Sequence, residues 1–148
     1  MIHEGTHGIH GLDLLGRKVR MHEGAGLRVL IDAMNASIKK ADSLPLSSPL
    51  SHIMCRTVAA IESDTRAAWA DEDAVAALSN ATLYLKAVGH AVITWMWLEL
   101  AVTSERLNEV LTELERDFHR GKVAAANYFF ITNCPISTYG HRSSRRTT

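Results

Sequence analysis

The amino-acid sequence predicts an all-α protein, a bundle of about five helices. Only three prolines, Pro45, Pro49 and Pro135, occur in 148 residues, so long segments run without a helix breaker. Apolar residues recur at intervals of three and four, which places them on one face of a helix. No stretch alternates apolar and polar residues over a useful strand length, so the predicted helices pack on one another.

The composition fits one globular domain. Hydrophobic residues make up 47% of the chain and charged residues 22%. The formal net charge is +0, so neither a nucleic acid nor an anionic membrane is an expected partner. Cys55 and Cys134 are far apart, which argues against a disulfide-stapled secreted scaffold. The N-terminus shows no signal-peptide pattern, and a cytoplasmic location is expected.

Apolar spacing predicts the first two helices. The first begins near Gly8, and its apolar face consists of Ile9, Leu12, Leu15 and Val19. Gly24 and Gly26 mark a break before the second, which ends near Ala41. The apolar face of the second helix consists of Leu27, Leu30, Ile31, Met34 and Ile38. Residues 43–49 contain two prolines and three serines, a composition typical of a loop.

A third helix is predicted from Pro49, in its first turn, to about Trp69. Asp71 is the predicted N-cap of a fourth helix, which is expected to continue unbroken to about Val102. The fourth helix is apolar on more than one face, as expected at the centre of a bundle. Its most apolar stretch, 83–102, is interrupted by Lys86, His90 and Glu99, which favours a buried helix over a membrane span.

Ser104 is the predicted cap of a fifth helix that ends before Pro135. Its inward residues are predicted to be Leu107, Val110, Leu111, Leu114 and Phe118, with Glu105 among those facing outward. Beyond it, residues 137–148 consist largely of Ser, Thr, Arg and Gly, which indicates a frayed tail.

The N-terminal residues His3-Glu4-Gly5-Thr6-His7 fit the HExxH pattern of zinc hydrolases. In that pattern two histidines one helical turn apart bind zinc, and the glutamate acts on the metal-bound water. Gly5 and Gly8 would each weaken the required helix by about 1 kcal/mol relative to Ala. A zinc-dependent hydrolase is therefore one alternative function.

A longer stretch supports a different interpretation. Residues 2–18, I-H-E-G-T-H-G-I-H-G-L-D-L-L-G-R-K, resemble the E-G-T segment of acyl-CoA dehydrogenases. The Gly-Ile-x-x-Leu-Asp form is similar to the subgroup related to the alkylation-response flavoprotein, which carries an extra C-terminal helical domain. The resemblance continues at 24–28, 81–89 and 122–130. It implies that 1–22 end the dehydrogenase domain, 23–136 form the extension and 137–148 a tail.

The resemblance implies the α,β-dehydrogenation of acyl-CoA thioesters with FAD as cofactor. Glu4 would be the catalytic base, a role that suits a carboxylate placed against the α-carbon. Gly5 would lie beside the substrate thioester, and Thr6, His7 and Gly8 would approach the FAD. Small residues allow such close approach. No metal is implied. His7 stands where the family has Asn or Ser.

In the resembled family, most of the flavin and thioester sites lie upstream of the E-G-T motif. The chain is therefore expected to be a C-terminal fragment that is inactive alone, since an oriented cofactor and substrate supply most of the rate. A second alternative is a helical module that self-associates without catalysis. The expected partners are acyl-CoA, by family, and further copies of the chain.

Overall fold

The computed structural model describes residues 6–70, 73–107 and 112–133, and every regular element in these ranges is helical. The elements are α1 (Thr6–Leu12), the π-helical turn η1 (Asp13–Lys18), the 3-10 turn η2 (Met21–Gly24), α2 (Ala25–Asp42), α3 (Ser48–Ala68), α4 (Ala74–Leu78), α5 (Ala81–Leu107) and α6 (Glu113–Asn133). The predicted all-α bundle of about five helices is confirmed, since five of the six α-helices in the described ranges have seven or more residues.

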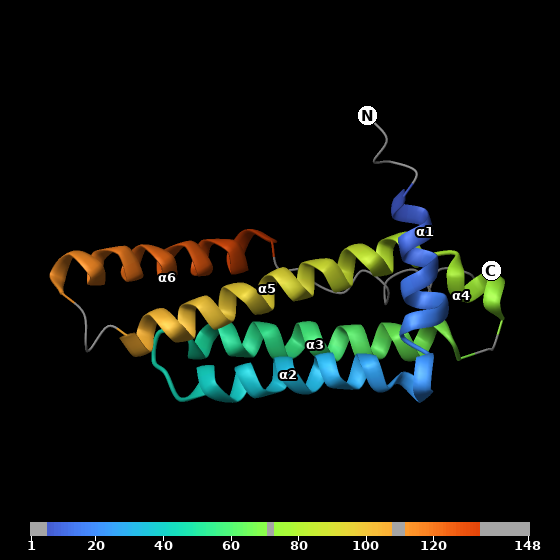
Figure 1. Cartoon of the computed structure of the whole chain (residues 1–148), viewed down its shortest axis with the longest axis horizontal. Coiled ribbons are helices and arrows are strands. Elements are labelled where there is room, and N and C mark those ends of the chain that lie inside the picture. Colours follow the sequence, from blue (N-terminus) through green and yellow to red (C-terminus); the bar gives the residue numbers. More distant parts are fainter. Residues whose placement is uncertain (1–5, 71–72, 108–111, 134–148) are drawn as a thin grey trace, which may run out of the picture.

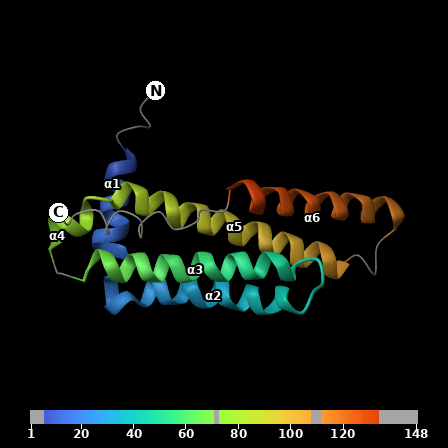
Figure 2. The ribbon, with the colours of Figure 1, turned by 180° about the vertical axis from the view of Figure 1, so that it is seen from behind.

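The helices form an elongated bundle in which α5 is central (Figure 1). Helices α2 and α3 run antiparallel beside each other, and α5 lies along both of them, as the view from behind also shows (Figure 2). Helix α6 folds back over one half of α5, while α1 crosses its other half. By length and composition α5 could cross a membrane, but here it contacts α1, α2, α3 and α6.

The core lies between α2, α3 and α5. Met34, Met54 and Leu98, one from each helix, are completely buried. Burying a side chain of this size stabilises the fold by roughly 1.5–3 kcal/mol. The predicted inward positions Ile31 and Ile38 of α2 are buried as well, so the apolar spacing identified this face correctly.

Polar side chains between the helices are paired with one another. Trp95 Nε1 donates to Ser37 Oγ at 2.6 Å, and the Ser37 hydroxyl in turn donates to the Glu99 carboxylate. Lys40 Nζ lies 3.7 Å from the same carboxylate. Since each buried polar group finds a partner, the network adds directional contacts between α2 and α5 without a large desolvation cost.

The prediction of one helix from Asp71 to Val102 is wrong, since the chain turns between α4 and α5. Asp73 caps α4 by accepting a hydrogen bond from Val75 N at 2.9 Å, while Asp71 lies outside the described residues. Ser79 N bonds to the carbonyls of both Val75 and Ala76, which ends α4. The apolar pattern continues through this turn, so spacing alone could not locate it.

The prediction that Ser104 caps a fifth helix is also wrong. Ser104 lies inside α5 and is 1% exposed, with its hydroxyl 3.1 Å from His119 Nδ1 of α6. Glu105, predicted to face outward, instead reaches the loop before α3. Its carboxylate accepts from Leu46 N at 2.8 Å, Ser47 N at 2.9 Å and Ser47 Oγ at 2.7 Å. These tertiary contacts outweigh the local capping preference.

Helix α6 turns a different face inward from the one predicted. Leu114 is 83% exposed and Phe118 61% exposed, and Leu107 at the end of α5 is exposed too. The side that packs on the bundle consists of Val123, Ala126 and Phe130. Residues Val110 and Leu111 and the predicted tail 137–148 lie outside the described residues.

Candidate functional site

The first turn of α1 carries the part of the predicted active-site segment that the structure describes. Thr6 and His7 are exposed there, and Gly8 is partly exposed. The turn extends beyond the body formed by α2 to α6 (Figure 1). Glu4 and Gly5, together with His3 of the HExxH pattern, lie outside the described residues. The structure therefore places three neighbouring predicted residues on one open turn.

Two glycines of α1 have opposite surroundings. A Cβ added at Gly8 would meet no atom within 4 Å, so the backbone there is open to close approach by another molecule or domain. A Cβ added at Gly11 would lie 2.6 Å from the carbonyl oxygen of Ala81 at the start of α5. Glycine at position 11 is therefore required where α1 crosses α5, whereas glycine at position 8 is not required by this fold.

The turn η1 fixes the orientation of α1 on the bundle. Trp69 Nε1 donates to the carbonyl oxygen of Leu15 at 3.2 Å, and the Arg20 guanidinium lies 4.0 Å from the centre of the Trp69 ring. On the outer side, Arg17 Nε lies 2.5 Å from the Asp13 carboxylate. This hydrogen bond from Arg17, with Lys18 nearby, lowers the pKa of Asp13. These contacts hold the residues that follow α1 against the bundle and so keep the open first turn of α1 in place.

A left-handed reversal connects this region to α2. Three consecutive residues have positive φ values, His22 at 49°, Glu23 at 56° and Gly24 at 80°. Glycine adopts this conformation readily, but His22 and Glu23 do so at a cost of about 1–2 kcal/mol each. The Arg28 guanidinium donates to the Glu23 carbonyl and helps to hold the reversal. The predicted break at Gly24 lies in this reversal.

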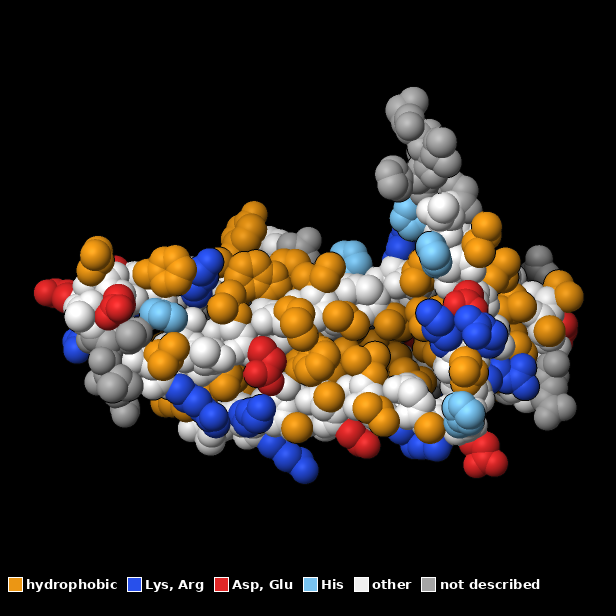
Figure 3. Space-filling model, viewed as in Figure 1, with side chains coloured by type: hydrophobic (Ala, Val, Ile, Leu, Met, Phe, Trp, Pro, Cys, Tyr) orange, Lys and Arg blue, Asp and Glu red, His pale blue; other side chains and the backbone are white. Residues whose placement is uncertain are grey.

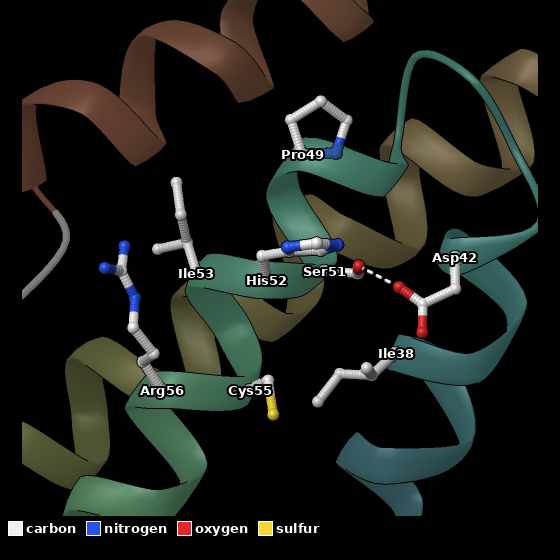
Figure 4. A pocket seen from close by; sticks show the side chains of 8 residues that line it. All are labelled: Ile38, Asp42, Pro49, Ser51, His52, Ile53, Cys55 and Arg56. Atoms are coloured by element: carbon white, nitrogen blue, oxygen red, sulfur yellow. Dashed lines mark hydrogen bonds between the residues drawn. The ribbon is translucent and has the colours of Figure 1, made fainter.

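A groove of about 730 Å³ lies between α2 and α3, close to the loop that joins them (Figure 4). It is lined by Ile38, Asp42, Pro49, Ser51, His52, Ile53, Cys55 and Arg56. The Asp42 carboxylate accepts a hydrogen bond from the Ser51 hydroxyl. In Figure 4 the Arg56 and Asp42 side chains lie at opposite ends of the groove, so their charges do not meet. None of the predicted site residues contributes to this groove.

The contact of Glu105 with Ser47 was missed by sequence reasoning. In the structure, the Ser47 side chain makes no cap hydrogen bond within α3 and bonds to Glu105 instead. The two residues are 58 positions apart, so no local pattern in the sequence indicates this contact.

A comparison with protein-family models places most of this fold in a known family. The model described as "Acetyl-CoA dehydrogenase C-terminal like" matches residues 30–144, a range that includes α3 to α6 and most of α2. No curated protein and no solved structure gives a significant match. Since the matched range covers well over half of the sequence, the chain belongs to the acetyl-CoA dehydrogenase C-terminal-like family.

Proposed function

We propose that this chain is the helical C-terminal part of an FAD-dependent acyl-CoA dehydrogenase and that it does not catalyse the reaction by itself. The family match over residues 30–144 carries the proposal. The acyl-CoA dehydrogenases are FAD-dependent. In the proposed role, the bundle presents the start of α1, with its E-G-T sequence, to a flavin and a thioester bound largely by other protein segments.

The open first turn of α1 fits this role. The Thr6 hydroxyl and the His7 imidazole are exposed and can hydrogen-bond to polar atoms of a cofactor. The backbone at Gly8 can be approached without a clash. The contacts of η1 with Trp69 hold α1 in place, so these groups need little ordering on assembly.

Glu4 is the proposed base that takes the α-proton of the thioester. FAD, when bound, supplies the acceptor for the β-hydride. A carboxylate alone cannot remove a proton from a thioester at a useful rate, because catalysis depends on its placement against an oriented substrate. The isolated chain should therefore neither retain flavin nor oxidise acyl-CoA.

The test is to titrate the purified chain with FAD and then to add acyl-CoA thioesters with an artificial electron acceptor. We expect no stoichiometric change in flavin absorbance or fluorescence and no reduction of the acceptor. Stoichiometric FAD binding would refute the proposed dependence on other segments. Acceptor reduction that is lost in Glu4→Gln would refute inertness while supporting the role of Glu4.

The same preparation tests the zinc alternative. Elemental analysis should find no stoichiometric zinc if the E-G-T interpretation holds. Zinc that is present in the wild type and in His22→Ala, but lost in His7→Ala, would favour a zinc-dependent hydrolase. His22 is the matched control because it is an exposed histidine outside the HExxH pattern.

A further inference from the structure

A hollow of about 240 Å³ lies between η1, α2 and α5. In the space-filling view, hydrophobic side chains surround a recess next to a group of Lys and Arg side chains (Figure 3). Six of the residues that line the hollow have large hydrophobic side chains: Leu14, Val19, Leu27, Leu30, Tyr84 and Val88. Among the described residues that line it, only Lys18 and Gly26 differ from this pattern. The predicted active-site residues at the start of α1 do not contribute to the hollow.

The interior of the hollow is apolar. Its deepest residues, Val19, Tyr84 and Val88, are buried, and its other hydrophobic side chains are partly exposed. The Tyr84 hydroxyl bonds to Thr65 Oγ1 of α3 at 2.5 Å, so Tyr84 offers its ring to the hollow. An aliphatic chain placed here would exchange water for apolar contacts, which is favourable in proportion to the area buried.

The rim of the hollow beside η1 has an excess of positive charge. Lys18 Nζ and Arg17 Nε lie 3.4 Å and 2.5 Å from the Asp13 carboxylate, which therefore offsets only one of these two cations. The Lys18 side chain is 60% exposed, so its ammonium group can turn towards a ligand. Gly26 lies in the first turn of α2, where the helix dipole adds a partial positive charge. This rim complements a ligand with one negative charge.

The volume of the hollow limits the length of the chain that it can hold. An apolar cavity of about 150 Å³ accommodates benzene, which has six carbon atoms. By the same proportion, the hollow of about 240 Å³ suits about eight to ten carbon atoms. The paired long chains of a membrane lipid would exceed this volume.

We propose that this hollow binds a free medium-chain fatty acid. The aliphatic chain lies on the buried side chains between α2 and α5, and the carboxylate accepts hydrogen bonds from the Lys18 ammonium group. The carboxylate carries the single negative charge that the rim complements. The inference goes beyond the proposed function, because it concerns a free acid rather than a thioester and a site that needs no flavin.

The experiment titrates the full chain with octanoate in a calorimeter, and octanol serves as an uncharged probe of the same chain length. Octanoate should bind with a stoichiometry of one. Gly26→Leu should raise the octanoate Kd by about 30-fold or more, because the new side chain occupies the hollow in place of the ligand. An added Cβ at Gly26 meets no atom within 4 Å, so the fold can accept it. Gly121→Leu on α6 is the matched control, an equally open glycine that should leave the Kd unchanged.

A second variant tests the charge of the rim. Lys18→Gln removes one cation, while Arg17 still binds Asp13. The octanoate Kd should rise by about 5-fold, as expected for an exposed ion pair, and the octanol Kd should stay unchanged. Lys39→Gln, at an exposed position of α2 outside the hollow, is the control and should change neither value.

A wild-type chain that does not bind octanoate would overturn the inference, as would binding that Gly26→Leu leaves intact. Binding that Gly26→Leu abolishes but Lys18→Gln does not weaken would also overturn it, because the hollow would then accept apolar chains whatever their charge. Far-UV circular dichroism shows whether each variant keeps its helices, and the Lys18→Gln test does not depend on the folding of Gly26→Leu. Flavin binding by the chain would refute the proposed function and leave this inference untouched.

Discussion

Replacing Glu105 by Ala should destabilise the fold more than any other change at a partly exposed charged residue of α5. The Glu105 carboxylate accepts hydrogen bonds from Leu46 N, Ser47 N and Ser47 Oγ. It thereby ties the end of α5 to the loop that begins α3. The substitution removes all three bonds and the negative charge next to the first turn of α3.

The expected loss of stability depends on whether each donor that loses the Glu105 carboxylate is exposed or buried. Leu46 is exposed, so water can replace its lost acceptor. Ser47 is completely buried, and its N–H and hydroxyl would lose a charged partner. Hydrogen bonds to charged groups contribute about 1.5–3 kcal/mol, and a negative charge at a helix N-terminus about 0.3–1 kcal/mol. Two such bonds and the helix charge together contribute about 3–7 kcal/mol. We expect Glu105→Ala to lower the free energy of unfolding by about 3–4 kcal/mol, the low end of this range, because the Glu105 side chain is partly exposed.

Urea unfolding followed by circular dichroism measures this change. Glu105→Gln should lose roughly half as much, because its amide oxygen can still accept one of the bonds. Glu62→Ala is the control, an exposed carboxylate on α3 that should change stability by no more than about 0.5 kcal/mol. If Glu105→Ala behaves like Glu62→Ala, the tie between α5 and the α3 loop does not stabilise the fold and the argument fails.

Three further predictions concern stability. Gly11→Ala should lower the free energy of unfolding by about 1–3 kcal/mol, because the added Cβ would lie 2.6 Å from the Ala81 carbonyl oxygen. Gly8→Ala should raise the free energy of unfolding by about 0.5–1 kcal/mol, because the space around Gly8 is open. Equal effects in urea titrations would contradict the crossing of α1 and α5. Burial raises the pKa of Asp64, so its contribution to stability falls as pH rises through that pKa. Asp64→Asn should then be more stable than the wild type at pH 7 and lose this advantage in acid, and a pH-independent difference would count against the burial effect. Glu23→Gly should raise the free energy of unfolding by about 1 kcal/mol, because glycine adopts the positive φ of this position without strain. Asp32→Gly is the control, an exposed position in the middle of α2, and it should lower the free energy of unfolding. Thermal melts that rank the two variants the other way would refute the strain at Glu23.

The fold was predictable where one helix has one apolar face. In α2 the positions Ile31, Met34 and Ile38 recur at helical spacing and are all buried. The loop before α3 was predictable as well, because Pro45 cannot continue the preceding helix and Pro49 is favoured in the first turn of the next one. Both features depend only on residues within one segment, so they can be predicted from the sequence alone.

The helix boundaries after Trp69 were not predictable from spacing. Val75 continues the apolar pattern yet is 82% exposed, so the pattern does not reveal the turn between α4 and α5. Ser104 has the chemistry of a cap, but its partner His119 lies on another helix and outweighs that preference. Tertiary contacts of this kind carry no local signal.

The candidate site depended on resemblance rather than on periodicity. Thr6, His7 and Gly8 were singled out because they follow Glu4 in an E-G-T sequence, and the structure places them on an open turn. The exposure of Leu114 and Phe118 was not predicted, since both were assigned to the core. Their spacing places them on one side of a helix, but spacing alone does not reveal whether that side packs inward.

The left-handed reversal at His22–Gly24 has a consequence for how this region can change. It turns the chain with backbone torsion angles over three residues, not with a long loop, and α2 begins at the very next residue. An insertion or deletion here would rotate everything before it relative to the bundle and would separate Gly11 from Ala81. Side chains in this segment can therefore be exchanged far more freely than its length can be altered.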